Sequence, residues 1–198
     1  MTFKEKIKNI WDYDKWFIIG GLVLILALCY FAKDVIFKEK FDYTVVYAAE
    51  GYLTEEELNT FNNVLAEYAE DLDENGKTNV KIINIEFPPE GANHGQILKE
   101  KNTLLMTELA LQENCIFIIE EEKILSLYEN NTDAFLDLST LSEEIPEGTR
   151  YIKLNQTKLK DKLPMLDGEL ILVLRVPYIE KYLDIYEDCQ NYIDRILE

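Results

Sequence analysis

An uninterrupted apolar segment near the N-terminus constrains this chain more than any other feature. Residues Trp16–Ala32 read WFIIGGLVLILALCYFA and include no charged side chain. If the amine of Lys33 reaches up to the headgroups, the segment continues to Phe37 and has about 22 residues, enough to cross a hydrocarbon core about 30 Å thick. We therefore predict a transmembrane anchor helix over residues 16–37. Its anchoring side chains are Trp16, Phe17, Leu22, Leu24, Leu26 and Phe31.

The charges beside this segment predict its orientation. Four lysines precede it and three follow it, and lysine-rich flanks stay on the cytoplasmic side. We expect residues 1–15 to form a cytoplasmic tail and residues 41–198 to lie outside the cytoplasm, in a protein that crosses the cell membrane once. A cleaved signal peptide is the first alternative, although no convincing small-residue cleavage site follows the segment. A lipoprotein signal ending at Cys29 is the second, although the bulky Leu28 fits such a signal poorly.

The remainder of the chain is strongly acidic. Residues 41–198 carry 13 of the 20 basic residues and 33 of the 38 acidic ones, a net charge of −20. Such a domain is repelled by phosphate backbones and by anionic headgroups. Nucleic acid is therefore excluded as a partner, whereas cations and basic protein surfaces are not.

Residues 41–198 show alternating strand and helix patterns. A capping box at Thr54 and Glu57 opens a helix whose apolar stripe runs from Leu58 to Leu72. Further helices are predicted at 96–112, 122–128 and 179–197, and strands at 43–49, 80–87, 115–120, 151–154 and 170–176. Because strand and helix alternate three times, we predict a single three-layer-like α/β domain with a mostly parallel sheet.

The residues that usually carry catalysis are scarce. His94 is the only histidine, no serine lies in a nucleophile elbow, and no pair of cysteines has metal or redox spacing. Cys115 and Cys189 could form a disulfide in an oxidising compartment, but buried free thiols are the favoured interpretation. We therefore predict that the protein is not an enzyme.

One loop has the spacing of a calcium-binding loop. In the segment DLDENGKTNV, oxygen-bearing side chains stand at positions 1, 3, 5 and 9, and glycine stands at position 6. Position 12 is Ile82 instead of the bidentate glutamate, and a strand follows instead of a helix. The alternative is a capped helix end followed by an Asn-Gly turn. The candidate calcium ligands are Asp71, Asp73, Asn75, the carbonyl of Lys77, and Asn79.

Several segments together resemble a known group of proteins. They are KIKNIWDYDKWFIIGGLVLI, DYTVVYAAEGYLTEEE, DLDENGKTNV and LLMTELALQENCIFIIEE. The chain is similar over about residues 4–140 to uncharacterised membrane-anchored proteins of Firmicutes bacteria. The order of its elements also resembles one lobe of an ABC-transporter solute-binding protein. The resemblance implies an extracytoplasmic binding domain, but with room for one lobe the usual two-lobed cleft is not expected, and no functional residues carry over.

Three functions follow as hypotheses. The first is a non-enzymatic, membrane-tethered binding or accessory module with a membrane-protein partner, associated with a transporter or with envelope assembly. The second is an extracytoplasmic sensor of calcium or of a small ligand whose identity the sequence does not give. A hydrolase built on acidic residues is the third and the least favoured, because no pair of carboxylates stands out among so many.

Overall fold

The computed structural model describes residues 15–17, 19–30, 41–89, 94–128, 132–166 and 169–197. The chain divides into two units, residues 1–40 and residues 41–198.

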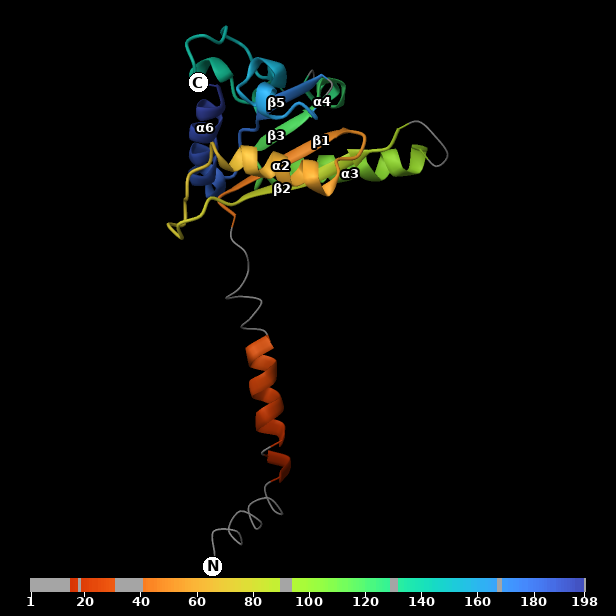
Figure 1. Cartoon of the computed structure of the whole chain (residues 1–198), viewed down its shortest axis with the longest axis vertical. Coiled ribbons are helices and arrows are strands. Elements are labelled where there is room, and N and C mark those ends of the chain that lie inside the picture. Colours follow the sequence, from red (N-terminus) through yellow and green to blue (C-terminus); the bar gives the residue numbers. More distant parts are fainter. Residues whose placement is uncertain are drawn as a thin grey trace, which may run out of the picture. The chain divides into compact units, whose positions relative to one another are not determined.

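The first unit contains a helix at residues 15–17 and 19–30, drawn in red and orange in Figure 1. Five of the predicted anchoring side chains lie on it and are exposed, namely Trp16, Phe17, Leu22, Leu24 and Leu26. Phe31 lies outside the described residues, as do position 18 and positions 31–37 of the predicted anchor. Within the described part of the chain, no helix has both the length and the apolar character needed to cross a bilayer. The transmembrane helix therefore stays a prediction.

The second unit is built on one five-stranded sheet with the order β2-β1-β3-β5-β4. β2 (Val80–Phe87), β1 (Tyr43–Glu50) and β3 (Ile116–Glu120) run parallel to one another. β5 (Leu170–Leu174) is antiparallel to β3, and β4 (Ile152–Lys153) is antiparallel to β5. The α/β class is confirmed, and the sheet is mixed: its three parallel strands lie side by side, and the other two strands join by antiparallel pairing.

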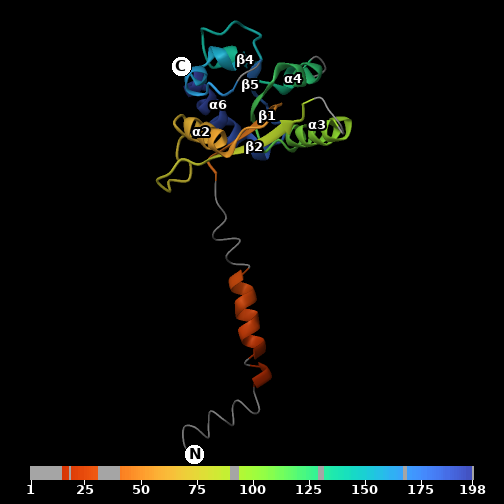
Figure 2. The same cartoon turned by 45° about the vertical axis from the view of Figure 1, so that its right-hand side comes forward.

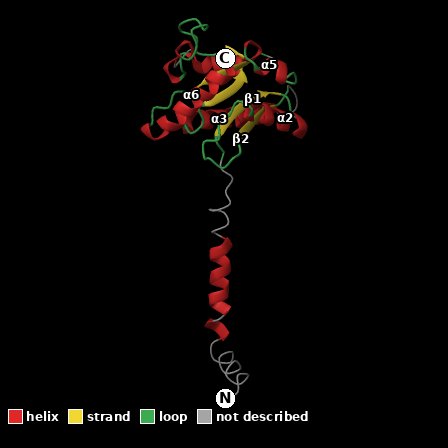
Figure 3. Ribbon diagram, turned by 60° about the vertical axis from the view of Figure 1, so that its left-hand side comes forward, coloured by secondary structure: helices red, strands yellow, loops and turns green. Residues whose placement is uncertain are grey.

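Helices cover both faces of this sheet, as Figures 2 and 3 show. On one face, α2 (Glu55–Ala66) and α6 (Leu183–Leu197) share a hydrophobic core with Tyr43, Val45 and Tyr47 of β1. On the other face, α3 (His94–Leu111) and α4 (Glu121–Tyr128) share a core with Val46 and Ala48. Successive side chains of a strand point to opposite faces, so a strand buried on both faces must be apolar throughout.

Short helical segments fill much of the chain between α4 and α6. They are η1 (Thr132–Ala134), η2 (Leu138–Thr140), η3 (Leu154–Gln156), α5 (Leu159–Lys162) and η4 (Glu180–Tyr182). Most of them are too short to show an apolar periodicity in the sequence, and none of them was predicted as a separate helix.

α2 begins as predicted and ends earlier than predicted. Thr54 and Glu57 form both hydrogen bonds of the capping box, and the bonds from the backbone and side chain of Thr54 lower the pKa of the Glu57 carboxyl. The helix stops at Ala66, whereas its apolar pattern continues to Leu72. Of the later apolar residues of that pattern, Tyr68 packs against the same core from outside the helix, whereas Leu72 is exposed.

The C-terminal helix α6 ties distant parts of the chain together. The ring of Tyr192 is fully buried and stacks on Tyr43 with 4.5 Å between the ring centroids, while its hydroxyl donates to the carbonyl of Leu65 at 2.8 Å. One turn later, Arg195 donates to the carbonyl of Tyr68 at 2.7 Å and pairs with Glu70 at 2.6 Å. The last helix therefore fixes β1 and the segment after α2 in one arrangement.

Candidate functional site

The loop between α2 and β2 folds around its own acidic side chains. The two carboxylate oxygens of Asp71 accept hydrogen bonds from the backbone N–H groups of Asn75, at 3.1 Å, and Gly76, at 2.6 Å. Gly76 has φ +83° and Glu74 has φ +56°. Left-handed backbone of this kind favours glycine, which accounts for Gly76 at the turn. The loop therefore wraps back on Asp71.

A third carboxylate reaches this loop from the start of the sheet. β1 pairs with β2 in a register that sets Tyr43 beside Val80, so Asp42 lies next to Asn79. The carboxylate of Asp42 accepts from the N–H of Asn79 at 2.7 Å and from the N–H of Leu72 at 2.9 Å. Asp42 therefore holds the loop against the end of β1.

Asp42, Asp71 and Asp73 form the candidate metal centre. One carboxylate oxygen from each lies within 4.8 Å of the others. Asp42 and Asp71 are half-buried, whereas Asp73 is exposed. Carboxylate oxygens suit hard cations such as Ca²⁺, and each oxygen that already accepts one N–H has a second lone pair. The three negative charges also repel one another, and a cation would relieve this repulsion.

The structure brings together only part of the predicted ligand set. Asp71 and Asp73 lie in the cluster, while the side-chain oxygen of Asn75 accepts from the N–H of Lys77 at 2.9 Å. The carbonyl of Asn79 accepts from the N–H of Asp42 at 2.9 Å. Among the described residues, the Lys77 carbonyl accepts no hydrogen bond. Asp42 is not among the predicted ligands, because it lies 29 positions before Asp71 and is brought close only by the pairing of β1 with β2.

A second notable surface lies on α3. Four large apolar side chains of this helix are 38–47% exposed, namely Ile97, Leu104, Met106 and Leu111. Leu105 and Leu109 are buried against the sheet. A helix that covers a sheet normally keeps one apolar face inward and a polar face outward. On α3, apolar side chains also stand on the outer flanks.

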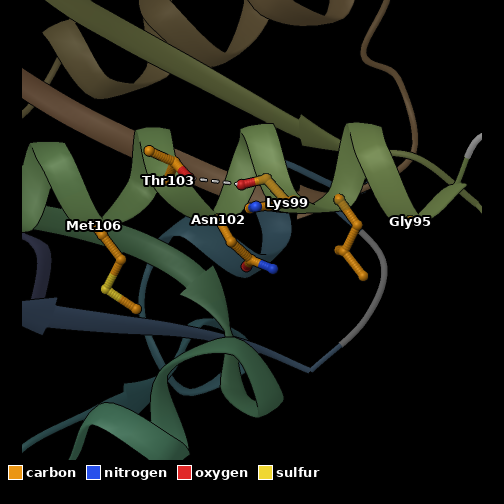
Figure 4. A pocket seen from close by; sticks show the side chains of 6 residues that line it. Gly95, Lys99, Asn102, Thr103 and Met106 are labelled. Atoms are coloured by element: carbon orange, nitrogen blue, oxygen red, sulfur yellow. Dashed lines mark hydrogen bonds between the residues drawn. The ribbon is translucent and has the colours of Figure 1, made fainter.

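One flank of α3 is hollowed. The hollow has a volume of about 410 Å³ and is lined along the helix by Gly95, Leu98, Lys99, Asn102, Thr103 and Met106. Figure 4 shows Asn102 and Met106 pointing to the same side of the helix, while the Thr103 hydroxyl donates back to the carbonyl of Lys99 at 2.8 Å. Because every lining residue comes from one helix, the hollow is a surface feature and not an enclosed ligand cavity.

The two cysteines of the second unit are free and buried. Cys115 immediately precedes β3 and Cys189 lies in α6, and both belong to the same hydrophobic core. The hydrogen bond with Cys115 and burial raise the pKa of the Cys189 thiol. A protonated, buried thiol such as that of Cys189 is a poor nucleophile, and both cysteines pack within the core.

Comparison with known proteins assigns no function to this chain, so a functional assignment rests on the surface features described above. No protein-family model matches the chain, and neither the curated proteins nor the solved structures include a match.

Proposed function

We propose that this protein is a membrane-tethered, non-enzymatic binding module whose extracytoplasmic domain docks a partner protein through α3. The apolar segment at residues 16–37 would hold the domain at the cell membrane. The observation that supports docking is the exposed apolar surface of α3.

Three of the exposed residues on α3 form a regular stripe. Ile97, Leu104 and Leu111 are seven residues apart, so their side chains stand almost in line, with a drift of about 20° per step. This stripe lies about 100° around the helix from Leu98 and Leu105, which face the sheet. A stripe of this spacing is what another helix packs against.

The charge of the domain favours a protein over a lipid surface as the partner. Residues 41–198 carry a net charge of −20, which repels anionic headgroups. Exposed apolar side chains on a soluble face otherwise mark protein contacts. We therefore infer a partner protein that presents an apolar helix and a neutral or basic surface.

Leu104→Lys tests this proposal. In native membranes, chemical crosslinking of the full chain should give a discrete complex with a second protein, and Leu104→Lys should reduce its yield by about tenfold, because a buried interfacial leucine contributes about 1.5–3 kcal/mol. Ala110→Lys is the matched control, since Ala110 is exposed on the same helix about 120° around its axis from the stripe. Both variants should unfold within about 0.5 kcal/mol of the parent. An equal yield of complex from Leu104→Lys and the parent would contradict docking through α3.

Calcium binding by Asp42, Asp71 and Asp73 is the second candidate function. Its support is the convergence of three carboxylates on one point. A site with few ligands and two half-buried carboxylates would bind weakly, in the range of about 10⁻⁴–10⁻³ M that extracellular calcium modules show. It would serve to stiffen the loop against β1 where calcium is abundant.

Thermal unfolding tests the calcium proposal. With 5 mM CaCl₂ in place of a chelator, binding in this range should stabilise the domain by about 1–2 kcal/mol and raise Tm by about 3–6 °C. Asp42→Asn should abolish the increase, whereas Glu74→Gln, in the same loop and outside the cluster, should retain it. Magnesium at equal concentration controls for ionic strength. Identical melting curves in chelator, calcium and magnesium would rule the site out.

A further inference from the structure

The guanidinium of Arg175 is buried without a hydrogen-bond acceptor for one of its nitrogens. Arg175 directly follows β5, and its backbone N–H donates to the carbonyl of Cys115 at 2.7 Å. The residue is 8% exposed, its Nη1 has no hydrogen-bond partner, and no carboxylate of the described residues lies within 4.0 Å of it. Burial lowers the pKa of this guanidinium. A buried charge without its full set of hydrogen bonds is costly, so its retention points to a partner that is not part of the domain.

The other two arginines of the chain show how unusual this is. Arg195 pairs with Glu70 at 2.6 Å, and Nη1 of Arg150 donates to the carbonyl of Phe135 at 2.7 Å. The domain offers 33 acidic residues, so an internal partner for Arg175 would have been easy to supply.

A second buried donor without a partner belongs to Gln112. This side chain is 1% exposed and follows the last residue of α3, where the backbone has φ +60°. Its Oε1 accepts from the N–H groups of Tyr178, at 2.8 Å, and Ile179, at 3.2 Å. Those two donors fix the orientation of the amide, because its nitrogen could not accept from them. The Nε2 group is therefore a buried donor without a hydrogen-bond partner, and interchanging the oxygen and nitrogen of the amide would not satisfy it.

Both unpaired donors lie at Tyr178. The Cζ of Arg175 is 5.9 Å from the centroid of the Tyr178 ring, and Gln112 binds the backbone of the same residue. The Tyr178 side chain is 80% exposed, so its ring can move without disturbing the core. Ile179 and Leu183, close by in the chain, also expose much of their apolar side chains. A buried cationic group thus lies near Tyr178, and exposed apolar side chains follow within a few residues of the chain.

We propose that Arg175 and Gln112 form a recognition site for a carboxylate that a partner protein presents within an apolar segment. The planar guanidinium offers parallel N–H groups that match a carboxylate, and the amide of Gln112 adds a further donor. Tyr178, Ile179 and Leu183 would cover the apolar residues on either side of that carboxylate. A small organic acid carries no apolar residues for these side chains to contact, which favours a protein segment as the source. The proposal extends docking to a second contact outside the α3 stripe.

Side-chain NMR of the full chain in detergent tests the site. The chain has three arginines, so the Nε–Hε signal of each can be assigned by substitution and followed separately. The probes are acetate, acetyl-Leu-Glu-Leu-amide and acetyl-Leu-Gln-Leu-amide, with ionic strength held constant by chloride. The Arg175 signal should shift saturably with the glutamate peptide, while the signals of Arg150 and Arg195 stay in place. Affinity for the glutamate peptide should exceed that for acetate and for the glutamine peptide by about tenfold each.

Substitutions connect the response to the site. Arg175→Lys should weaken binding of the glutamate peptide by about tenfold, whereas Arg150→Lys should leave it unchanged. Ile179→Ser, at a partly exposed position, should weaken the peptide but not acetate, and it keeps the test valid if Arg175→Lys fails to fold. Equal or unsaturable shifts at all three arginines would overturn the site. If acetate binds saturably and the glutamate peptide binds no more tightly, the proposal that a protein segment supplies the carboxylate would be overturned. Neither result depends on the α3 stripe. A negative result at Arg175 would therefore leave docking through α3 to be tested separately by Leu104→Lys.

Discussion

Tyr192→Ala is expected to lower the free energy of unfolding of the domain by about 3–5 kcal/mol, a large part of the stability of a domain of this size. The Tyr192 ring is fully buried, stacks on Tyr43 and lies between α6 and the sheet, so its removal leaves a cavity in the core. A urea titration followed by near-ultraviolet circular dichroism, which reports the packing of tyrosine side chains, measures the change.

Two variants separate the contributions of the ring and of the hydroxyl. Tyr192→Phe keeps the ring and leaves the carbonyl of Leu65 without its donor, which should cost about 1–2 kcal/mol. Tyr52→Ala is the control for losing a tyrosine at the surface, since Tyr52 is 70% exposed, and it should change stability by less than about 0.5 kcal/mol. An equal loss from Tyr192→Ala and Tyr192→Phe would mean that the ring makes no packing contribution.

The double substitution Leu24→Lys and Leu26→Lys is expected to release the full chain from membranes. On insertion scales a central leucine contributes about −0.3 to −0.6 kcal/mol and a central lysine costs about 2.5–3.5 kcal/mol. Ten Leu, Ile, Val and Phe residues in the apolar segment together contribute about −3 to −6 kcal/mol, and two lysines would cancel this.

Carbonate extraction of membranes measures this outcome. The parent chain should stay with the membrane pellet and be released by detergent, while the lysine variant should move to the supernatant. Leu24→Ala with Leu26→Ala is the matched control, because it shortens the same side chains without adding charge and should remain in the pellet. A lysine variant that resists carbonate as the parent does would contradict an anchor at residues 16–37.

Sequence patterns predicted the elements of the domain better than their arrangement. The capping box at Thr54 and the apolar runs of β1, β2 and β3 depend on neighbouring residues, and each was located within a few positions. The direction of β5 was not predictable in this way. A continuous apolar run indicates a strand buried on both faces, and it does so equally for a parallel and an antiparallel neighbour.

The candidate sites likewise combine residues that are close in the sequence with residues that only the fold brings together. Asp71 and Asp73 follow from the spacing within one loop, whereas Asp42 joins them only through the pairing of two strands. Arg175 and Gln112 stand 63 positions apart, and neither belongs to a motif. Only the fold shows that both lie at Tyr178 and that each retains an unused donor.

The position of α6 also determines when the domain can fold. Arg195 donates to the hydroxyl of Tyr43, 152 residues earlier in the chain, and Tyr192 closes the core over β1. A chain made from its N-terminus therefore holds β1 and α2 without their covering helix until its last residues are complete. Docking of α6 is therefore the closing step of folding, because the core cannot be completed before this C-terminal helix has been made.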